Sequence, residues 1–418
     1  MNASHDIERD LARWMEVVAP SRAPDNLAPS IVDRTGSLRP RPGWLARLKE
    51  PSMQTQISLR NYFGFGRSPR LILIALLILV LTVGGIVVGS QLLRQRPLPP
   101  PFGLAGNGLL ASNIDGEIVL IEPDGTNVQR LVLPFEGVTG TSFSRDGTRI
   151  AAWATPNPGR GSQKSLIVAN ADGSGAFAID PTKLVGSPGF RIAWSPDDRR
   201  LAFSGSGDRL FVADIDARSV RELRPDQSIT SRKDPAWAPD GRLAFRCLTT
   251  DGVLHLCLMS ADFQSEQILQ TSPGTEWAFH GPSWSHDGTA IAYQVDDTID
   301  HGSTDPGYDV ATIDVTTGTE RILTRGLADH AILPIWSPDD RHLLFQTPSG
   351  PGVVRSDGTG LRLFGQSCGW IEPSPDGAFA TCASGNQVVL YPIEGGGQPT
   401  VIEVGGPVDF VNWQRVAN

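Results

Sequence analysis

From about residue 104 to the C-terminus, short runs of alternating apolar and polar residues are separated by turns rich in Pro, Asp and Gly. Alternation with a period of two predicts β-strands with one buried face. One turn-and-strand unit occurs six times, at spacings of about 37 to 52 residues. The copies are FSRDGTRIAAW (from Phe143), WSPDDRRLAFS (from Trp194), WAPDGRLAFRC (from Trp237), WSHDGTAIAYQ (from Trp284), WSPDDRHLLFQ (from Trp336) and PSPDGAFATCA (from Pro373). This repeat length is typical of β-propeller blades.

Every copy carries an Asp in its turn, usually followed by Gly. Pro at the second and Gly at the fourth position suit a type I turn. The six residues are Asp146, Asp197, Asp240, Asp287, Asp339 and Asp376. Because one residue type fills six equivalent turns, we interpret these carboxylates as supports of the turn backbone and not as catalytic groups.

A second turn recurs later in each unit and occurs seven times. Its positions are Asp124, Asp172, Asp216, Asp262, Thr316, Asp357 and Glu394. The repeat region begins within a unit, at GLLASNIDGEIVLIEPDG, and ends with VDFVNWQRVAN, which holds one strand and Trp413. We therefore predict an all-β domain over residues 104–418. Its core is a seven-bladed propeller of four-stranded blades over 104–416, closed by the C-terminal strand so that no sheet edge is left open.

The repeated pattern WSPDG…IAF…V.D.DG resembles the TolB-like, WD40-like (PD40) propeller repeat family. The resemblance covers about three quarters of the chain. It implies the propeller fold. It implies less about function, because such propellers serve as binding modules, as gating domains of peptidases and, in a few cases, as lyases.

Residues 71–93, LILIALLILVLTVGGIVVGSQLL, are 23 positions without a charge. As a helix this segment would be about 35 Å long, enough to cross a bilayer core. The 70 residues before it hold 11 Lys and Arg against 7 Asp and Glu, whereas the propeller holds 23 against 38. The positive-inside rule predicts a single-pass plasma-membrane protein with a cytoplasmic N-terminus and an extracytoplasmic propeller. An acidic propeller is not expected to bind nucleic acid, because phosphates repel it.

Residues 1–70 are expected to form a small, α-helical cytoplasmic segment. The stretch DIERDLARWMEVV places five apolar residues on one helical face: Ile7, Leu11, Trp14, Met15 and Val18. That stripe can dock a partner or close a two-helix hairpin, and both interpretations stay open. A helical head, one span and an outer domain resemble membrane anti-sigma factors, although the His-and-Cys zinc motif of many such heads is absent.

Two further features concern the membrane anchor. Gly85 and Gly89 form a G-x-x-x-G pattern, which allows two spanning helices to approach closely and would permit a homodimer. The next segment, RQRPLPPPFG at residues 94–103, is proline-dense. We predict a semi-rigid polyproline II linker that holds the propeller off the membrane.

All four cysteines lie in the propeller as two local pairs. Cys247 and Cys257 flank one predicted hairpin, and Cys368 and Cys382 flank another. Neighbouring strands bring Cβ atoms near disulfide distance only in certain registers, so four buried thiols are the alternative. An oxidising compartment favours two disulfides. Neither pair has the C-x-x-C spacing of zinc sites.

The variable loops of a propeller lie on the face opposite the Asp-containing turns, and such loops on a rigid scaffold often bind ligands. One loop, TSPGTEWAFHGPSW, contains Trp277, Phe279 and His280. Exposed aromatics beside a His suit peptide or sugar contact, although they can instead pack against the neighbouring blade.

The longest loop, DDTIDHGSTDPGYD, contains His301 and Tyr308, and His330 is expected on the same face. We predict Tyr308 and the two histidines as further ligand-binding residues. The acidic groups of this loop match no calcium-loop motif, so no metal is predicted.

Hydrolase, zinc-protease and phosphate-loop signatures are absent from the sequence. We therefore predict a non-catalytic binding module for a protein, peptide or glycan of the cell envelope, without a cofactor. One alternative is a transmembrane sensor whose head reads propeller occupancy. The other is a propeller lyase or hydrolase acting on an envelope polymer, whose scattered site would leave no local motif.

Overall fold

The computed structural model describes residues 98–155, 164–179, 191–271, 279, 281–297, 307–327, 329–365, 367–408 and 410–418. These ranges are all-β and contain no helix, so none there can cross a membrane. The span predicted at 71–93, the helical segment predicted at 1–70, and Gly85 and Gly89 lie outside the described residues.

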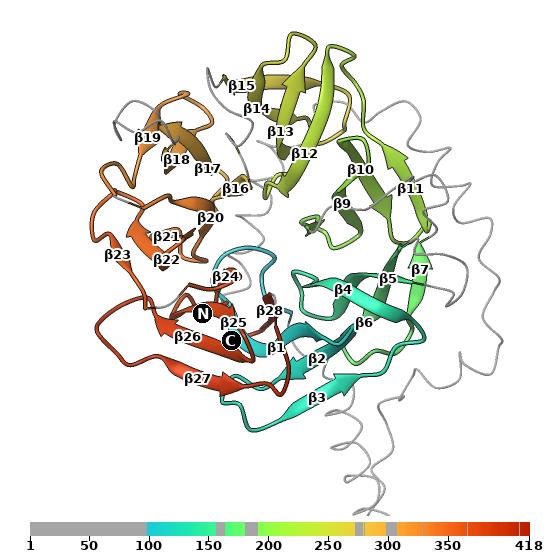
Figure 1. The fold of residues 1–418 in the computed structure, drawn as a ribbon. Helices are drawn as coiled ribbons and strands as arrows, with labels where there is room; N and C mark the ends of the chain where they lie inside the picture. Colours follow the sequence, from blue (N-terminus) through green and yellow to red (C-terminus); the bar gives the residue numbers. More distant parts are fainter. Residues whose placement is uncertain are drawn as a thin grey trace, which may run out of the picture. The chain divides into compact units, whose positions relative to one another are not determined.

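Seven four-stranded antiparallel sheets surround a central axis (Figure 1), which confirms the predicted seven-bladed propeller. Blade 1 has the order β28 (Val411–Val416), β1 (Gly106–Ile114), β2 (Glu117–Ile121) and β3 (Val128–Leu131). Blade 2 consists of β4 (Glu136–Phe143), β5 (Arg149–Thr155), β6 (Ser165–Asn170) and β7 (Phe177–Ile179). Blade 3 consists of β8 (Ile192–Trp194), β9 (Arg200–Gly205), β10 (Arg209–Asp214) and β11 (Ser219–Glu222).

The other four blades repeat this arrangement. Blade 4 contains β12 (Ile229–Trp237), β13 (Leu243–Thr249), β14 (Leu254–Met259) and β15 (Glu266–Thr271). Blade 5 contains β16 (Ser283–Trp284), β17 (Ala290–Asp297), β18 (Gly307–Asp314) and β19 (Glu320–Ile322). Blade 6 contains β20 (Ile332–Trp336), β21 (His342–Thr347), β22 (Gly350–Arg355) and β23 (Arg362–Leu363). Blade 7 contains β24 (Trp370–Pro373), β25 (Phe379–Ser384), β26 (Gln387–Pro392) and β27 (Thr400–Glu403).

The ring closes through the C-terminal strand, as the sequence predicts. β28 pairs antiparallel with β1, with Leu110 opposite Trp413 and Gly106 opposite Val416. The innermost strand of blade 1 therefore comes from the end of the chain, and the other three come from the start of the repeat region. The inner edge of β1 is thereby paired, and blade 1 has four strands like the other blades.

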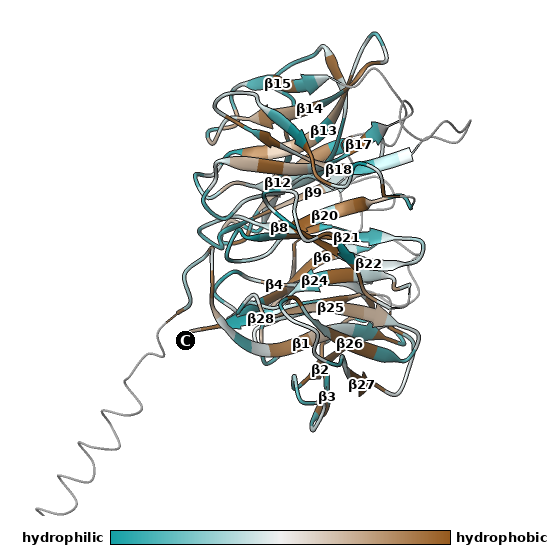
Figure 2. Cartoon of the chain, turned by 90° about the vertical axis from the view of Figure 1, so that its left-hand side faces the viewer, coloured by the Kyte–Doolittle hydropathy of each residue, from teal (hydrophilic) through white to brown (hydrophobic). Residues whose placement is uncertain are grey.

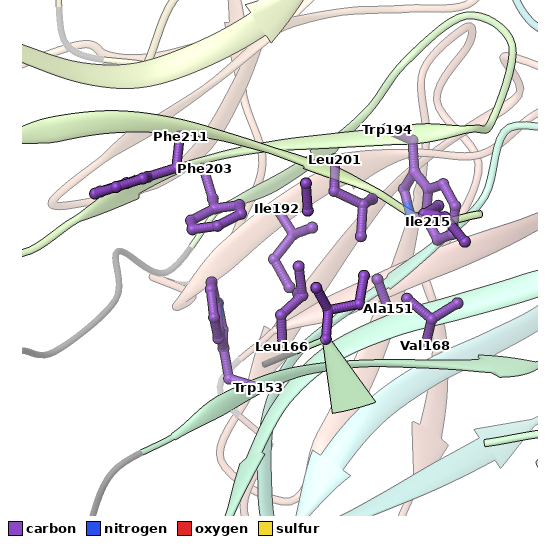
Figure 3. Close-up of a cluster of buried hydrophobic side chains, with 12 residues drawn as sticks. Ala151, Trp153, Leu166, Val168, Ile192, Trp194, Leu201, Phe203, Phe211 and Ile215 are labelled. Carbon is purple, nitrogen blue, oxygen red and sulfur yellow. The ribbon is translucent and has the colours of Figure 1, made fainter. Parts of the chain in front are cut away.

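The core lies between neighbouring blades. Between blades 2 and 3, Trp153 packs edge-on against Phe203 with ring centroids 5.1 Å apart, and both side chains are buried (Figure 3). In the side view, apolar positions follow the strands of the stacked blades and hydrophilic positions gather in the turns (Figure 2). This is the alternation that the sequence shows, with apolar residues facing the next blade.

The first turns of the repeats share one hydrogen-bonding geometry, which explains why each contains an Asp. Asp146 Oδ1 accepts hydrogen bonds from Ser144 Oγ at 2.6 Å and from the backbone N–H of Thr148 at 2.9 Å. The other five turn residues likewise accept the N–H two positions later: Asp197, Asp240, Asp287, Asp339 and Asp376. The interpretation of these carboxylates as backbone supports is confirmed.

Two turns carry Asp where the others carry Gly, and these side chains connect blades. Asp198 has a left-handed φ of 53° and accepts the backbone N–H groups of Arg145 and Asp146, at 2.8 and 2.9 Å. Asp340 bonds in the same way to the corresponding turn of blade 5. The second Asp of WSPDD thus fixes each of these blades to the neighbouring turn.

The structure joins Cys247 to Cys257 and Cys368 to Cys382 in disulfides. Cys247 on β13 and Cys257 on β14 lie diagonally, because Cys257 faces Phe245 and Cys247 faces His255 in the register. Their Cα atoms are 6.0 Å apart, within the usual range for a disulfide. The first bond ties neighbouring strands of blade 4, and the second ties the segment before β24 to β25 in blade 7.

Candidate functional site

The innermost strands of all seven blades enclose a cavity of about 340 Å³ around the axis. One equivalent position lies at the end of six of these strands and inside β28. It is filled by Phe143, Trp194, Trp237, Trp284, Trp336, Pro373 and Trp413. The residues one position earlier line the cavity, and they are Ser142, Ala193, Ala236, Ser283, Ile335, Glu372 and Asn412. Because side chains alternate along a strand, this ring of residues faces the axis while the Trp side chains are buried in the blades.

The buried Trp side chains also fix the ring of blades. Trp194 Nε1 donates to the Ser142 carbonyl at 3.2 Å, and Trp237 Nε1 donates to the Ala193 carbonyl at 3.1 Å. Trp284 Nε1 repeats this contact with the carbonyl of Ala236 at 3.2 Å. The acceptor is each time the cavity-lining residue of the preceding blade, so the cavity wall is held by blade-to-blade hydrogen bonds.

One end of the cavity is covered by Phe102, which belongs to the segment preceding the propeller. The guanidinium of Arg145 lies over the Phe102 ring, 4.0 Å from its centroid, and the His286 ring is 6.2 Å away. Arg415 donates to the carbonyls of Pro100 and Gly103 at 2.8 and 2.9 Å. Burial lowers the pKa of Arg145 to about 10, so it stays charged at neutral pH.

Residues 94–103 are predicted to be a semi-rigid linker that holds the propeller off the membrane, and the structure describes 98–103 of them. Within this part Pro99 is buried and Phe102 covers the cavity, so the end of the segment packs on the propeller. The contacts are with first turns, since Arg145, His286 and Pro375 belong to those turns in blades 2, 5 and 7, and Ala105 N–H bonds to the Pro375 carbonyl at 2.9 Å. We call the side with these turns the turn face. The loop face carries the loops between blades and between second and third strands, such as 223–228 and 206–208.

Glu372 is the one carboxylate among the cavity-lining residues that the structure describes. Its Oε2 accepts a hydrogen bond from Trp370 Nε1 and its Oε1 accepts one from Asn412 Nδ2, both at 3.2 Å. Burial raises the pKa of Glu372 to about 7, although these two donors and the nearby Arg191 charge oppose the rise. The carboxyl group therefore changes its charge near neutral pH.

We predict that Glu372→Gln changes how stability depends on pH. The pKa of Glu372 is about 7 in the folded chain and 4.5 ordinarily, so the folded state binds more protons between these values. The free energy of unfolding of the wild type then falls as pH rises through this window, by about 3 kcal/mol from this group. Gln does not titrate, so the variant lacks this pH dependence. Its thermal unfolding temperature should equal that of the wild type at pH 4.5 and exceed it at pH 8. The same difference in unfolding temperature at both pH values would contradict the prediction.

The model of PD40, the TolB beta propeller domain, matches residues 111–356. The chain belongs to this family. It matches no curated protein. Among solved structures, an oligogalacturonate lyase in complex with manganese has a TM-score of 0.52 and 12% identity, covering 73% of this chain and 86% of the lyase chain.

Two further solved structures are similar to this TolB-family propeller. The tricorn protease has a TM-score of 0.50 and 11% identity over 73% of this chain and 35% of its own. TolB from Acinetobacter baumannii has a TM-score of 0.46 and 16% identity over 73% of this chain and 81% of its own. At these identities the likeness shows the fold alone. The TolB-like fold suggests a binding module, and the fold is shared with a lyase and a protease.

The predicted ligand-binding residues of the TolB-family propeller have different outcomes. Trp277, His280 and His301 lie outside the described residues. Tyr308 and His330 come together, with ring centroids 5.6 Å apart and an N–H···O bond from Ala331 to Tyr308. Neither ring is fully buried, and their role in binding stays a prediction.

The expectation that Phe279 is an exposed aromatic is wrong. Its side chain is 1% exposed, and its ring lies 5.2 Å from that of Tyr293 in the core of blade 5. Its backbone N–H donates to the Gln294 carbonyl at 2.7 Å. The packing alternative holds for this residue, because burying an aromatic side chain outweighs leaving it at the surface.

Sequence reasoning missed the cavity residues Arg191, Trp370 and Glu372. The signal was present: the aligned repeats place Glu372 one position, and Arg191 and Trp370 three positions, before the last residue of an innermost strand. Charged residues at these axis-facing positions could have been noticed. In the described part of the chain, no group of three or more His, Cys, Asp or Glu side chains could hold a metal ion.

Proposed function

We propose that the chain is a single-pass membrane protein whose extracytoplasmic propeller is a non-catalytic binding module. The ligand would enter the central cavity from the loop face. The observation that carries this proposal is the position of Phe102, which covers the turn-face end of the cavity. A fixed scaffold with polar groups converging on one cavity is the usual form of a binding site.

The proposed orientation follows from the same segment. The predicted span ends at residue 93, and residues 98–103 are bound to the turn face through Arg415 and Arg145. Because this segment occupies the turn face, we propose that a partner approaches the cavity from the loop face.

Photo-crosslinking in native membranes tests this proposal. The probe replaces Ser367, an exposed residue three positions before the cavity-lining Trp370 on the loop face. A matched probe replaces Ala217, an exposed residue in a second turn on the turn face. We expect a discrete adduct from 367 and none from 217. Adducts from 217 alone, or none from either in a folded propeller, would overturn the proposal.

A third probe at Glu16 addresses the predicted cytoplasmic segment. The sensor alternative requires that ligand binding to the propeller changes the contacts of this segment. An adduct at position 16 that forms only when ligand is bound would support that alternative. Its absence alongside an adduct at 367 would leave a binding module alone.

A further inference from the structure

Arg191 is a cation that lines the cavity and has no ion pair among the residues that the structure describes. Its guanidinium lies over the Trp370 ring, 5.0 Å from the centroid, and it makes no hydrogen bond or ion pair within the described part of the chain. Burial lowers its pKa from the ordinary value, yet an arginine remains charged at neutral pH. A desolvated charge is costly unless an opposite charge or hydrogen-bond acceptor meets it.

The carboxylates around Arg191 leave this charge only partly compensated. Glu372 on β24 attracts Arg191 electrostatically, but its oxygens already accept bonds from Trp370 and Asn412. Asp234 on β12 also attracts it, and Asp234 lies 3.8 Å from Arg246. Neither carboxylate is paired with the Arg191 guanidinium.

Two further arginines line the cavity. Arg145 and Arg415 lie at its turn-face end beside Phe102. Three arginines thus face a cavity in which Glu372 is the one lining carboxylate that the structure describes. The cavity volume of 340 Å³ equals about ten water molecules at roughly 30 Å³ each, enough for a small organic acid.

We propose that the central cavity binds a small organic carboxylate whose anionic group pairs with Arg191. This rests on the proposed function, since it names the ligand class of the same site. Arg forms two parallel hydrogen bonds with a carboxylate, a geometry that a neutral amide or alcohol cannot match. Trp370 of blade 7 and Asn412 of blade 1 also line the cavity and lie within reach of the rest of the ligand.

Calorimetric titration of the full chain in detergent tests the inference. The probes are N-acetylglycine and glucuronate, with N-acetylglycinamide and glucose as uncharged counterparts. We expect at least one of the two acids, the one whose carbon skeleton fits the cavity, to bind at least about tenfold more tightly than its matched neutral compound. The two pairs distinguish an amino-acid carboxylate from a sugar acid.

Arg191→Met should abolish this preference, and Arg191→Lys should retain part of it. Arg221→Met is the matched control, because Arg221 is exposed and lies over the Phe263 ring at 4.8 Å, away from the cavity. Equal binding of acid and neutral probes by the wild type, or unchanged preference in Arg191→Met, would overturn the inference.

The pH dependence gives a readout that does not need a folded Arg191→Met. As pH rises from 6 to 8, Glu372 ionises and competes for Arg191, so carboxylate binding should weaken about tenfold or less. Glu372→Gln should remove most of that dependence, and an unchanged pH slope in this variant would count against the inference. If the Ser367 adduct persists while no carboxylate binds, the inference fails and the proposed binding module stands. If both are absent, both fail.

Discussion

A chain that lacks residues 410–418 is expected not to form the native propeller. These residues hold β28, which supplies the innermost strand of blade 1. Trp413 is 4% exposed, and its Nε1 donates to Thr381 Oγ1 of blade 7 at 2.7 Å. Losing a buried Trp alone costs about 3–5 kcal/mol. That is a large part of the 5–15 kcal/mol by which such domains are usually stable.

β28 also connects three blades, which makes its loss larger than that of one side chain. Asn412 Oδ1 accepts the Phe143 N–H of blade 2 at 2.7 Å, and its Nδ2 donates to Glu372 of blade 7. Gln414 Nε2 donates to the Gly147 carbonyl at 2.8 Å. Without these contacts, the inner edge of β1 is open and the ring is unclosed.

The measurement is circular dichroism with thermal unfolding, together with gel filtration of the full chain and the truncated chain. Removing Asn418 alone is the control, because this residue is exposed and lies beyond β28. We expect the control to unfold cooperatively like the wild type. We expect the longer truncation to aggregate or to lose its cooperative transition. A truncated monomer with a wild-type transition would contradict the role of β28.

The sequence was sufficient for the architecture because the architecture is local and repeated. Alternating strands and Asp-containing turns specify each blade, and the mismatch between six first turns and seven second turns predicts closure by Trp413 and its strand. The number of blades is read from many repeats, so an atypical residue in one repeat does not change the prediction. The local pairs of cysteines favoured two disulfides over four buried thiols, and the structure joins them in that way.

The candidate site was less accessible to sequence reasoning, for a physical reason. Arg191 and Glu372 are 181 positions apart and meet only because seven strands converge on an axis. Phe279 shows the opposite error, because it was predicted to be an exposed binding residue and is buried. The sequence around an aromatic residue in a loop does not decide whether its side chain is buried or exposed. Phe102 shows a third case, in which a proline-rich segment binds its own domain. The aligned repeats mark which positions face the axis, but no local pattern shows which side chains meet there.

The second large effect is expected from Arg232→Met in blade 4. The guanidinium of Arg232 pairs with both carboxylate oxygens of Glu266, at 2.8 and 3.0 Å, and the two side chains are 4% and 0% exposed. Its other donors bond to the carbonyls of Ile229 and Asp226 at 2.9 and 2.6 Å. Removing the cation leaves a buried carboxylate without its partner. Breaking such a pair costs about 3–5 kcal/mol.

The cost should depend on pH with a definite sign. Burial raises the pKa of Glu266, and Arg232 lowers it in part. Without Arg232 the pKa rises further, so the folded variant holds a proton that the unfolded chain releases. The deficit relative to the wild type should therefore be largest at pH 8 and smaller at pH 5, where Glu266 is protonated in the variant. Urea unfolding at the two pH values measures this difference.

Two further variants decide whether the buried charge is the cause. Replacing both partners, as Arg232→Met with Glu266→Leu, should recover much of the loss, because an apolar pair leaves no charge to desolvate. Arg130→Met is the matched surface control, since Arg130 pairs with Glu117 and the two side chains are 53% and 55% exposed. We expect no measurable loss there, because solvent screens an exposed pair. Equal losses in Arg130→Met and Arg232→Met, or no recovery in the double variant, would assign the effect to lost packing and not to the unpaired Glu266 charge.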